Sequence, residues 1–190
     1  YVSASVGVAW APAGDVTADE LLRRADLAMY QAKSRGRSQY VVFDEAMSAS
    51  NEDRVLMEAA LHRAVNERLF ELHYQPVFRL DDHRVIGVEA LVRWRRGDQG
   101  LVLPGTFLPV AETSRLITSI GAWVVGEACR QAVGWGGRRP YVAVNLSQRE
   151  LIHEEVVSGV SLALQRSGLQ PGRLLLELTE GGLAQLGPEK

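Results

Sequence analysis

GVEALVRW, residues 87–94, is an apolar, strand-like run that carries Glu89 near its start. Two later runs share this pattern: VAVNLS, residues 142–147, with Asn145, and LLLELTE, residues 174–180, with Glu177. Helix-like patterns separate these runs, so the order from residue 85 onward is strand, helix, strand, helix, strand. Such an alternation predicts a parallel sheet or a barrel.

The polar residue in each of the three runs is its most informative feature. A buried carboxylate or amide costs several kcal/mol (about 2–7 for an uncompensated amide) unless it is hydrogen-bonded, paired or bound to a metal. Taken singly, each residue is explained by an ordinary hydrogen bond in the core or at a strand end. Together they indicate one site, because the carboxyl ends of parallel strands in a barrel meet at one mouth. Two carboxylates and an amide oxygen are hard ligands, which suit Mg²⁺ or Mn²⁺ and not zinc.

Four motifs in one order give this part of the chain a family resemblance. They are YQP at residues 74–76, EALVRW at 89–94, VNLS at 144–147 and ELTE at 177–180. The stretch from Tyr74 to Glu180 resembles the EAL domain of bacterial cyclic-di-GMP signalling proteins. The resemblance implies a TIM-like barrel and a divalent-metal phosphodiesterase that opens cyclic-di-GMP to linear pGpG.

The resemblance also implies roles for individual residues. It makes Glu89, Asn145 and Glu177 metal ligands, with Glu89 also catalytic, and it makes Gln75 and Arg93 contacts to the dinucleotide. Glu180 matches a residue that steadies a catalytic loop. Without the resemblance, Arg93 is better read as a solvated charge at a strand end and Gln75 as an unremarkable polar residue. The four histidines show no metal-type spacing and are interpreted as surface or satisfied side chains.

The opening segment, Ser3 to Phe43, resembles the end of a GGDEF domain. It contains SASVGVA at residues 3–9 and LLRRADLAMYQAKSRGR at residues 21–37. The resemblance implies that Lys33 and Arg37 contact the phosphates of a guanine nucleotide, although both also fit a solvated helix end. The motif that names the domain is absent from residues 1–190, so cyclase activity is not judged.

The remaining pattern predicts how the two parts are joined. Thr17 and Glu20 form a capping box for a helix over residues 17–35, and a strand follows at 40–43. The polar stretch 44–51 suits a linker and precedes a helix at 52–68. We therefore expect the end of a GGDEF domain at 1–44, a linker and helix at 45–70, and the first half of an EAL domain at 71–190.

Further elements are expected inside the last segment. The runs 72–80 and 85–94 predict a hairpin, and a Gly- and Pro-containing loop at 97–105 precedes a helix. Ser147 and Glu150 form a second capping box that opens another helix. The chain is expected to begin and end inside a domain, with the remaining EAL site residues beyond Lys190. The overall prediction is an α/β fold: a truncated TIM-like EAL barrel preceded by the last strand-helix-strand of a GGDEF domain.

Composition excludes some classes of function. With 46% hydrophobic and 23% charged residues the chain is globular, and 21 Lys plus Arg against 23 Asp plus Glu give no basic excess for a nucleic-acid polymer. No apolar run reaches the ~18 residues of a membrane span. The single cysteine, Cys129, sits in a predicted helix and fits a packing role in a reduced, cytoplasmic compartment.

Three functions remain open. The first is a cyclic-di-GMP phosphodiesterase that uses Mg²⁺ or Mn²⁺, as an intact protein that could be a homodimer. The second is a catalytically silent receptor that keeps the dinucleotide contacts and transmits binding to a partner. The third is a dimerisation or scaffold element that depends on the linker helix alone. The carboxylates and the amide in the three strands favour the enzyme.

Overall fold

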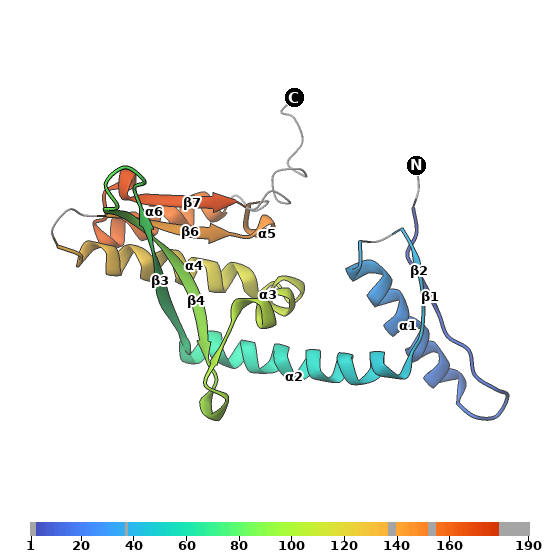
Figure 1. The fold of residues 1–190 in the computed structure, drawn as a ribbon. Helices are drawn as coiled ribbons and strands as arrows, with labels where there is room; N and C mark the ends of the chain where they lie inside the picture. The colour runs from blue at the N-terminus through green and yellow to red at the C-terminus, as the bar shows by residue number, and fades with distance from the viewer. Residues whose placement is uncertain (1–2, 37, 137–139, 152–154, 179–190) are drawn as a thin grey trace. The chain divides into compact units, whose positions relative to one another are not determined.

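The computed structural model describes residues 3–36, 38–136, 140–151 and 155–178. The chain divides into two compact units, Tyr1–Met57 and Glu58–Lys190. Each unit has its own sheet, of two strands in the first and five in the second (Figure 1).

The first unit pairs two short strands beside one helix. The strands β1 (Val6–Val8) and β2 (Tyr40–Val42) are parallel, and α1 (Ala18–Ser34) connects them. The Thr17 side chain caps α1 by accepting a hydrogen bond from the Glu20 amide at 3.2 Å. The helix packs closely on β1, since a Cβ at Gly7 would lie 2.0 Å from the Ala25 carbonyl oxygen. The predicted strand-helix-strand is confirmed.

The helix α2 (Glu45–Glu67) begins earlier than predicted. The predicted helix start at residue 52 is wrong, because residues 45–51 are already helical. The Asp44 side chain accepts a hydrogen bond from the Ala46 amide at 3.1 Å, which satisfies one of the free donors at the helix start. Residues 45–51 also contain no Gly or Pro that would break the helix.

The sheet of the second unit starts with a hairpin. The strands β3 (Phe70–Phe78) and β4 (Val85–Arg95) are antiparallel, as predicted. The strands β6 (Tyr141–Leu146) and β7 (Leu174–Leu178) follow in parallel with β4, which confirms the predicted parallel arrangement. The strand order is β3-β4-β6-β7, and the short β5 (Leu101–Val102) pairs with the end of β4.

Helices follow the strands of the second unit. They are α3 (Pro104–Thr113), α4 (Leu116–Val133), α5 (Gln148–Leu151) and α6 (Glu155–Ser167), with single turns of 3₁₀ helix at Gly97–Gln99 and Pro171–Arg173. The helix α3 was not predicted. Its first two residues, Pro104 and Gly105, fall in the predicted loop at 97–105, but Pro104 lies in the first turn, where proline is tolerated. The predicted helix after Ser147 forms as α5 and α6, and residues 152–154 between them lie outside the described residues.

The core of the second unit lies between the sheet and α4. Figure 1 shows α4 running along the sheet beside β6, with α6 next to it. Phe70, Trp94 and Phe107 form an aromatic cluster whose ring centroids are 5.9–6.4 Å apart, and Trp94 is 1% exposed. Trp94 therefore belongs to the core, as predicted. Cys129 on α4 is also fully buried.

Side chains alternate between the two faces of the sheet. Ala90 and Trp94 of β4, together with Val142 and Val144 of β6, are buried on one face. The other face carries the odd-numbered positions of these strands. The candidate site residues on it are Gln75, Glu89, Arg93, Asn145 and Glu177. None of the helices in the described segments combines the length and the apolar composition that a bilayer crossing requires.

Candidate metal-binding site

Glu89 and Asn145 meet on the face of the sheet away from α4. In the register of β4 and β6, Glu89 is opposite Ala143, two residues before Asn145, so both polar side chains project from the same face. The Asn145 Nδ2 donates a hydrogen bond to the Glu89 Oε1 at 2.6 Å. Glu89 is half-buried and Asn145 is exposed. The structure thus joins two residues that are 56 positions apart in the sequence.

Glu177 lies on the next strand at the same level. It is the direct register partner of Asn145 in the parallel pair β6 and β7. Register partners on neighbouring strands point to the same side of a sheet, so Glu177 shares the face of Glu89 and Asn145. The three residues therefore occupy successive strands of one face.

Gln75 and Arg93 lie on the same face. Gln75 is the register partner of Glu89 across the hairpin and is exposed. Arg93 follows Glu89 by four residues on β4, is half-buried, and donates from Nη1 to its neighbour's carbonyl oxygen, Val92 O, at 2.9 Å. Both residues therefore share the face of Glu89, Asn145 and Glu177.

The chemistry of this group fits a hard divalent cation. Two carboxylates and an amide supply oxygen ligands of the kind that Mg²⁺ and Mn²⁺ prefer. In the structure the Asn145 amide presents its N–H group to Glu89. A half-turn of that amide would direct its carbonyl oxygen toward a cation held by Glu89, without changing the shape of the side chain. Among the described residues, no three His, Cys, Asp or Glu side chains gather as a metal cluster.

The three remaining predicted site residues are Lys33, Arg37 and Glu180. Lys33 is exposed in the last turn of α1, in the first unit. Arg37 and Glu180 lie outside the described residues.

A second polar cluster beside Arg93 was missed by the sequence analysis. Glu71, on β3, is the register partner of Arg93. It pairs with the His73 Nε2 at 2.9 Å and also forms an ion pair with Arg95. The hydrogen bond from His73, and then that from Arg95, lower the pKa of Glu71 below its ordinary value. The alternation of residues 71, 73 and 75 along β3 is the signal that could have placed them on the face of Gln75.

Tyr74 belongs to the opposite face from Gln75. Its ring meets Trp135 edge-on, with centroids 5.2 Å apart, and burial raises its pKa to about 12. The YQP motif is thus divided between the two sides of β3. Gln75 shares the face of the polar group, and Tyr74 packs on the other face against Trp135, just after the end of α4.

Two known protein families match the sequence of this chain. The EAL domain family matches residues 58–187, and the family described as diguanylate cyclase, GGDEF domain, matches residues 1–39. The bifunctional diguanylate cyclase/cyclic di-GMP phosphodiesterase MucR of Pseudomonas aeruginosa is 43% identical over 94% of this chain and 27% of its own length. The cyclic di-GMP phosphodiesterase PdeR of Escherichia coli is 34% identical over 97% of this chain and 28% of its own. The chain spans about a quarter of the length of these relatives.

Solved structures show the same fold. The Pseudomonas aeruginosa MucR phosphodiesterase in complex with c-di-GMP is 42% identical, with a TM-score of 0.66 over 68% of this chain and 54% of that one. The FimX EAL domain of Xanthomonas citri in complex with c-diGMP is 26% identical, with a TM-score of 0.64 over 72% of this chain and 54% of that one. The α/β sheet with polar residues on successive parallel strands and the family matches lead to one conclusion: this chain belongs to the EAL domain family and carries sequence of the GGDEF family before it.

Proposed function

We propose that this chain supplies one part of the active site of a cyclic-di-GMP phosphodiesterase. The observation that carries the proposal is the contact between Glu89 and Asn145, with Glu177 in register beside them on the next strand. Asn145 is exposed and Glu89 and Glu177 are half-buried, so none of the three belongs to the buried core. The group supplies oxygen ligands of the kind a hard divalent cation prefers, and the related MucR and FimX structures are complexes with c-di-GMP, which supports this ligand for the proposed site.

In the proposed reaction, water opens the ring of the dinucleotide. The oxygen of the water forms a bond to one phosphorus while the bond from that phosphorus to the ribose 3′ oxygen breaks. One proton from the water ends on the 3′ oxygen, and the product is linear pGpG with a 5′-phosphate. No redox partner is needed.

The residues of this chain would have two roles, metal binding and dinucleotide binding. Glu89, Asn145 and Glu177 would hold Mg²⁺ or Mn²⁺, with Glu89 also shaping the catalytic centre. Such an ion makes bound water more acidic and draws negative charge from the phosphate. Arg93 would hydrogen-bond the phosphate oxygens with its planar guanidinium, and Gln75 would orient the dinucleotide by hydrogen bonds.

Several related assignments belong to the same proposal. Glu180 is proposed to steady a catalytic loop, and Lys33 and Arg37 to contact nucleotide phosphates in the GGDEF unit. The domain limits at residues 44 and 70, the cytoplasmic location and the homodimer remain predictions.

The test is turnover by the complete EAL domain that contains these residues. Cyclic-di-GMP is incubated with Mg²⁺ or Mn²⁺, pGpG is quantified by chromatography, and binding is measured separately by calorimetry. We expect metal-dependent pGpG formation that EDTA abolishes, with no turnover of 3′,5′-cyclic GMP as the control nucleotide. Tight binding of cyclic-di-GMP without turnover would favour the catalytically silent receptor over the enzyme. If the domain shows no binding and no turnover, the enzyme and the receptor are both refuted.

A further inference from the structure

Glu150 is the buried charged residue of the described segments, and the proposed function does not use it. It is 4% exposed and lies in α5, immediately after β6. Burial raises the pKa of its carboxyl group above the ordinary value. Because taking a carboxylate out of water is costly, its position requires compensating contacts.

The contacts of Glu150 join α5 to the end of β6. Its Oε2 accepts hydrogen bonds from the Ser147 amide at 2.8 Å and from the Ser147 hydroxyl at 2.6 Å. The Glu150 amide in turn lies 3.4 Å from the Ser147 Oγ, which completes the predicted capping box. Ser147 is the first residue after β6, two positions beyond Asn145.

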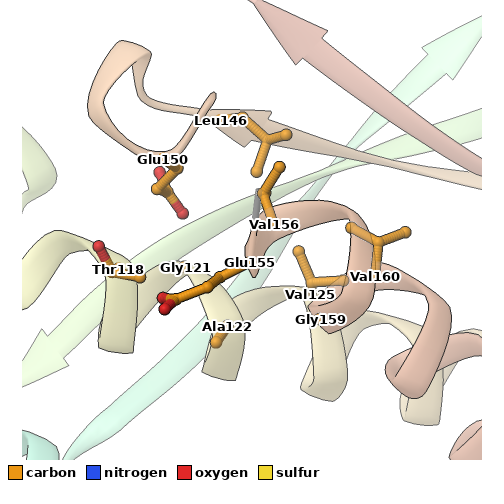
Figure 2. A pocket seen from close by; sticks show the side chains of 10 residues that line it. All are labelled: Thr118, Gly121, Ala122, Val125, Leu146, Glu150, Glu155, Val156, Gly159 and Val160. Carbon is orange, nitrogen blue, oxygen red and sulfur yellow. The ribbon is translucent and has the colours of Figure 1, made fainter. Parts of the chain in front are cut away.

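The other oxygen of the same carboxyl group lies against α4. A Cβ built on Gly121 would be 1.6 Å from the Glu150 Oε1, so the carboxyl group occupies the space that any larger residue at 121 would fill. Figure 2 shows Glu150 and Leu146 on one side of a small cavity and Gly121 of α4 on another. This cavity has a volume of about 50 Å³, and most of its lining is apolar.

Helix capping alone does not account for this arrangement. The helix α5 has only four residues, and a capping-box carboxylate satisfies the same donor equally well at the surface. Burial of Glu150 against Gly121 instead connects the turn after β6 to α4, which lies on the face of the sheet opposite to Glu89 and Asn145. Leu146, between Asn145 and Ser147, is 4% exposed and lines the same cavity. The backbone that follows Asn145 is therefore held at two consecutive residues, by the burial of Leu146 and by the hydrogen bonds of Ser147 to Glu150.

We propose that Glu150, packed against Gly121, is a positioning residue that sets the placement of Asn145 relative to Glu89. Its effect on metal binding rests on the proposed function, whereas its effect on the Asn145 to Glu89 contact does not. Glu150 itself touches neither of these two residues. It acts through Ser147 and the end of β6.

The experiment uses the complete EAL domain and compares Glu150→Ala with Glu150→Gln. Alanine removes the acceptor for the Ser147 amide, whereas glutamine keeps one acceptor oxygen in nearly the same shape. Three quantities are measured for each: the Asn145 Nδ2 to Glu89 Oε1 distance in a metal-free crystal structure, the Mn²⁺ dissociation constant by calorimetry, and the melting temperature. Val124→Ala, which shortens another buried side chain of α4, is the control for simple destabilisation.

We expect Glu150→Ala to lose the Asn145 to Glu89 contact and to weaken Mn²⁺ binding about 10- to 100-fold, the range known for residues behind metal ligands. Glu150→Gln should retain the contact and most of the affinity. Val124→Ala should melt at a lower temperature with unchanged Mn²⁺ affinity.

Gly121→Ala supplies an independent route to the same site. Its Cβ should displace the carboxyl group and weaken Mn²⁺ binding in the presence of Glu150. Added to Glu150→Ala, it should have little further effect, because the clashing oxygen is gone. Additive losses in the double variant would contradict the proposed link between the two residues.

The result that overturns the inference is a folded Glu150→Ala protein that keeps the Asn145 to Glu89 contact, whatever its melting temperature. If the unchanged protein binds no Mn²⁺ and forms no pGpG, the proposed function fails. In that case the Asn145 to Glu89 distance in the crystal structures is the one measurement that still tests the positioning role of Glu150.

Discussion

Replacement of Glu89 by glutamine is the sharpest test of the proposed metal site. The change removes one negative charge and keeps the length of the side chain and one carbonyl oxygen. Glu89 faces Asn145 across 2.6 Å, and that amide N–H would still find an oxygen acceptor. The local structure should therefore survive while the attraction for a divalent cation falls.

The expected loss of metal affinity is larger than the expected loss of folding stability. Residues behind a metal ligand typically change affinity or activity by about 10- to 100-fold, so loss of a charged ligand should cost at least about 100-fold. At about 1.4 kcal/mol for each factor of ten, this is about 2.8 kcal/mol of metal binding. The folded state loses at most the difference between a charge-assisted and a neutral hydrogen bond, about 1 kcal/mol.

The assay is pGpG formation by the complete EAL domain at a series of Mg²⁺ and Mn²⁺ concentrations, beside a thermal melt of each protein. Glu67→Gln, an exposed change in α2, is the matched control and should behave as the unchanged protein. For Glu89→Gln we expect turnover at least about 100-fold lower, a requirement for more metal, and a melting temperature within a few degrees. Near-normal turnover with a normal melt would show that Glu89 is not a ligand.

Three further outcomes are expected. Arg93→Ala in the complete domain should weaken cyclic-di-GMP binding more than Mn²⁺ binding, because a guanidinium cannot coordinate a cation; equal dinucleotide affinity in calorimetry would count against this role. Residues 1–190 by themselves should form no pGpG, because a hard divalent ion needs more ligands than these strands supply, and metal-dependent product from that piece would sink the expectation. The contacts of Glu71 with His73 and Arg95 should stabilise the fold above the ordinary carboxyl pKa and be lost as the pH falls through the lowered pKa of Glu71. Glu71→Gln should therefore flatten the acid side of a plot of melting temperature against pH, and an unchanged acid side would show that the contacts contribute nothing.

Much of the fold could be predicted because its signals are local. The capping residue Thr17 and the apolar spacing that follows it mark α1, and Thr17 does accept the expected amide. The hairpin and the parallel strands were likewise evident from the length and composition of their runs. The errors also have local causes. Residues 45–51 of α2 resemble a linker because they are small and polar, rich in Ser and Ala. The start of α3 resembles a loop because it carries Pro104 and Gly105.

The site was predicted less completely than the fold. Glu89, Asn145 and Glu177 stood out because each is a polar residue in an apolar run, and the structure places them on neighbouring strands of one face. Glu71 did not stand out, because β3 carries several polar residues and an acidic residue among them is not unusual. Its pairing with Arg95 depends on the register of the hairpin.

The sequence by itself determined most of the order of helices and strands, α3 excepted, together with the alternation of faces along each strand and the residue types available for a hard metal. These follow from the period of the backbone and from side-chain chemistry, which act within a few residues. Only the tertiary structure decided that Asn145 reaches Glu89 and that the Glu150 carboxyl group lies where Gly121 leaves space. Such contacts depend on strand register and on the packing of a helix against a turn, and both are set by segments far apart in the chain.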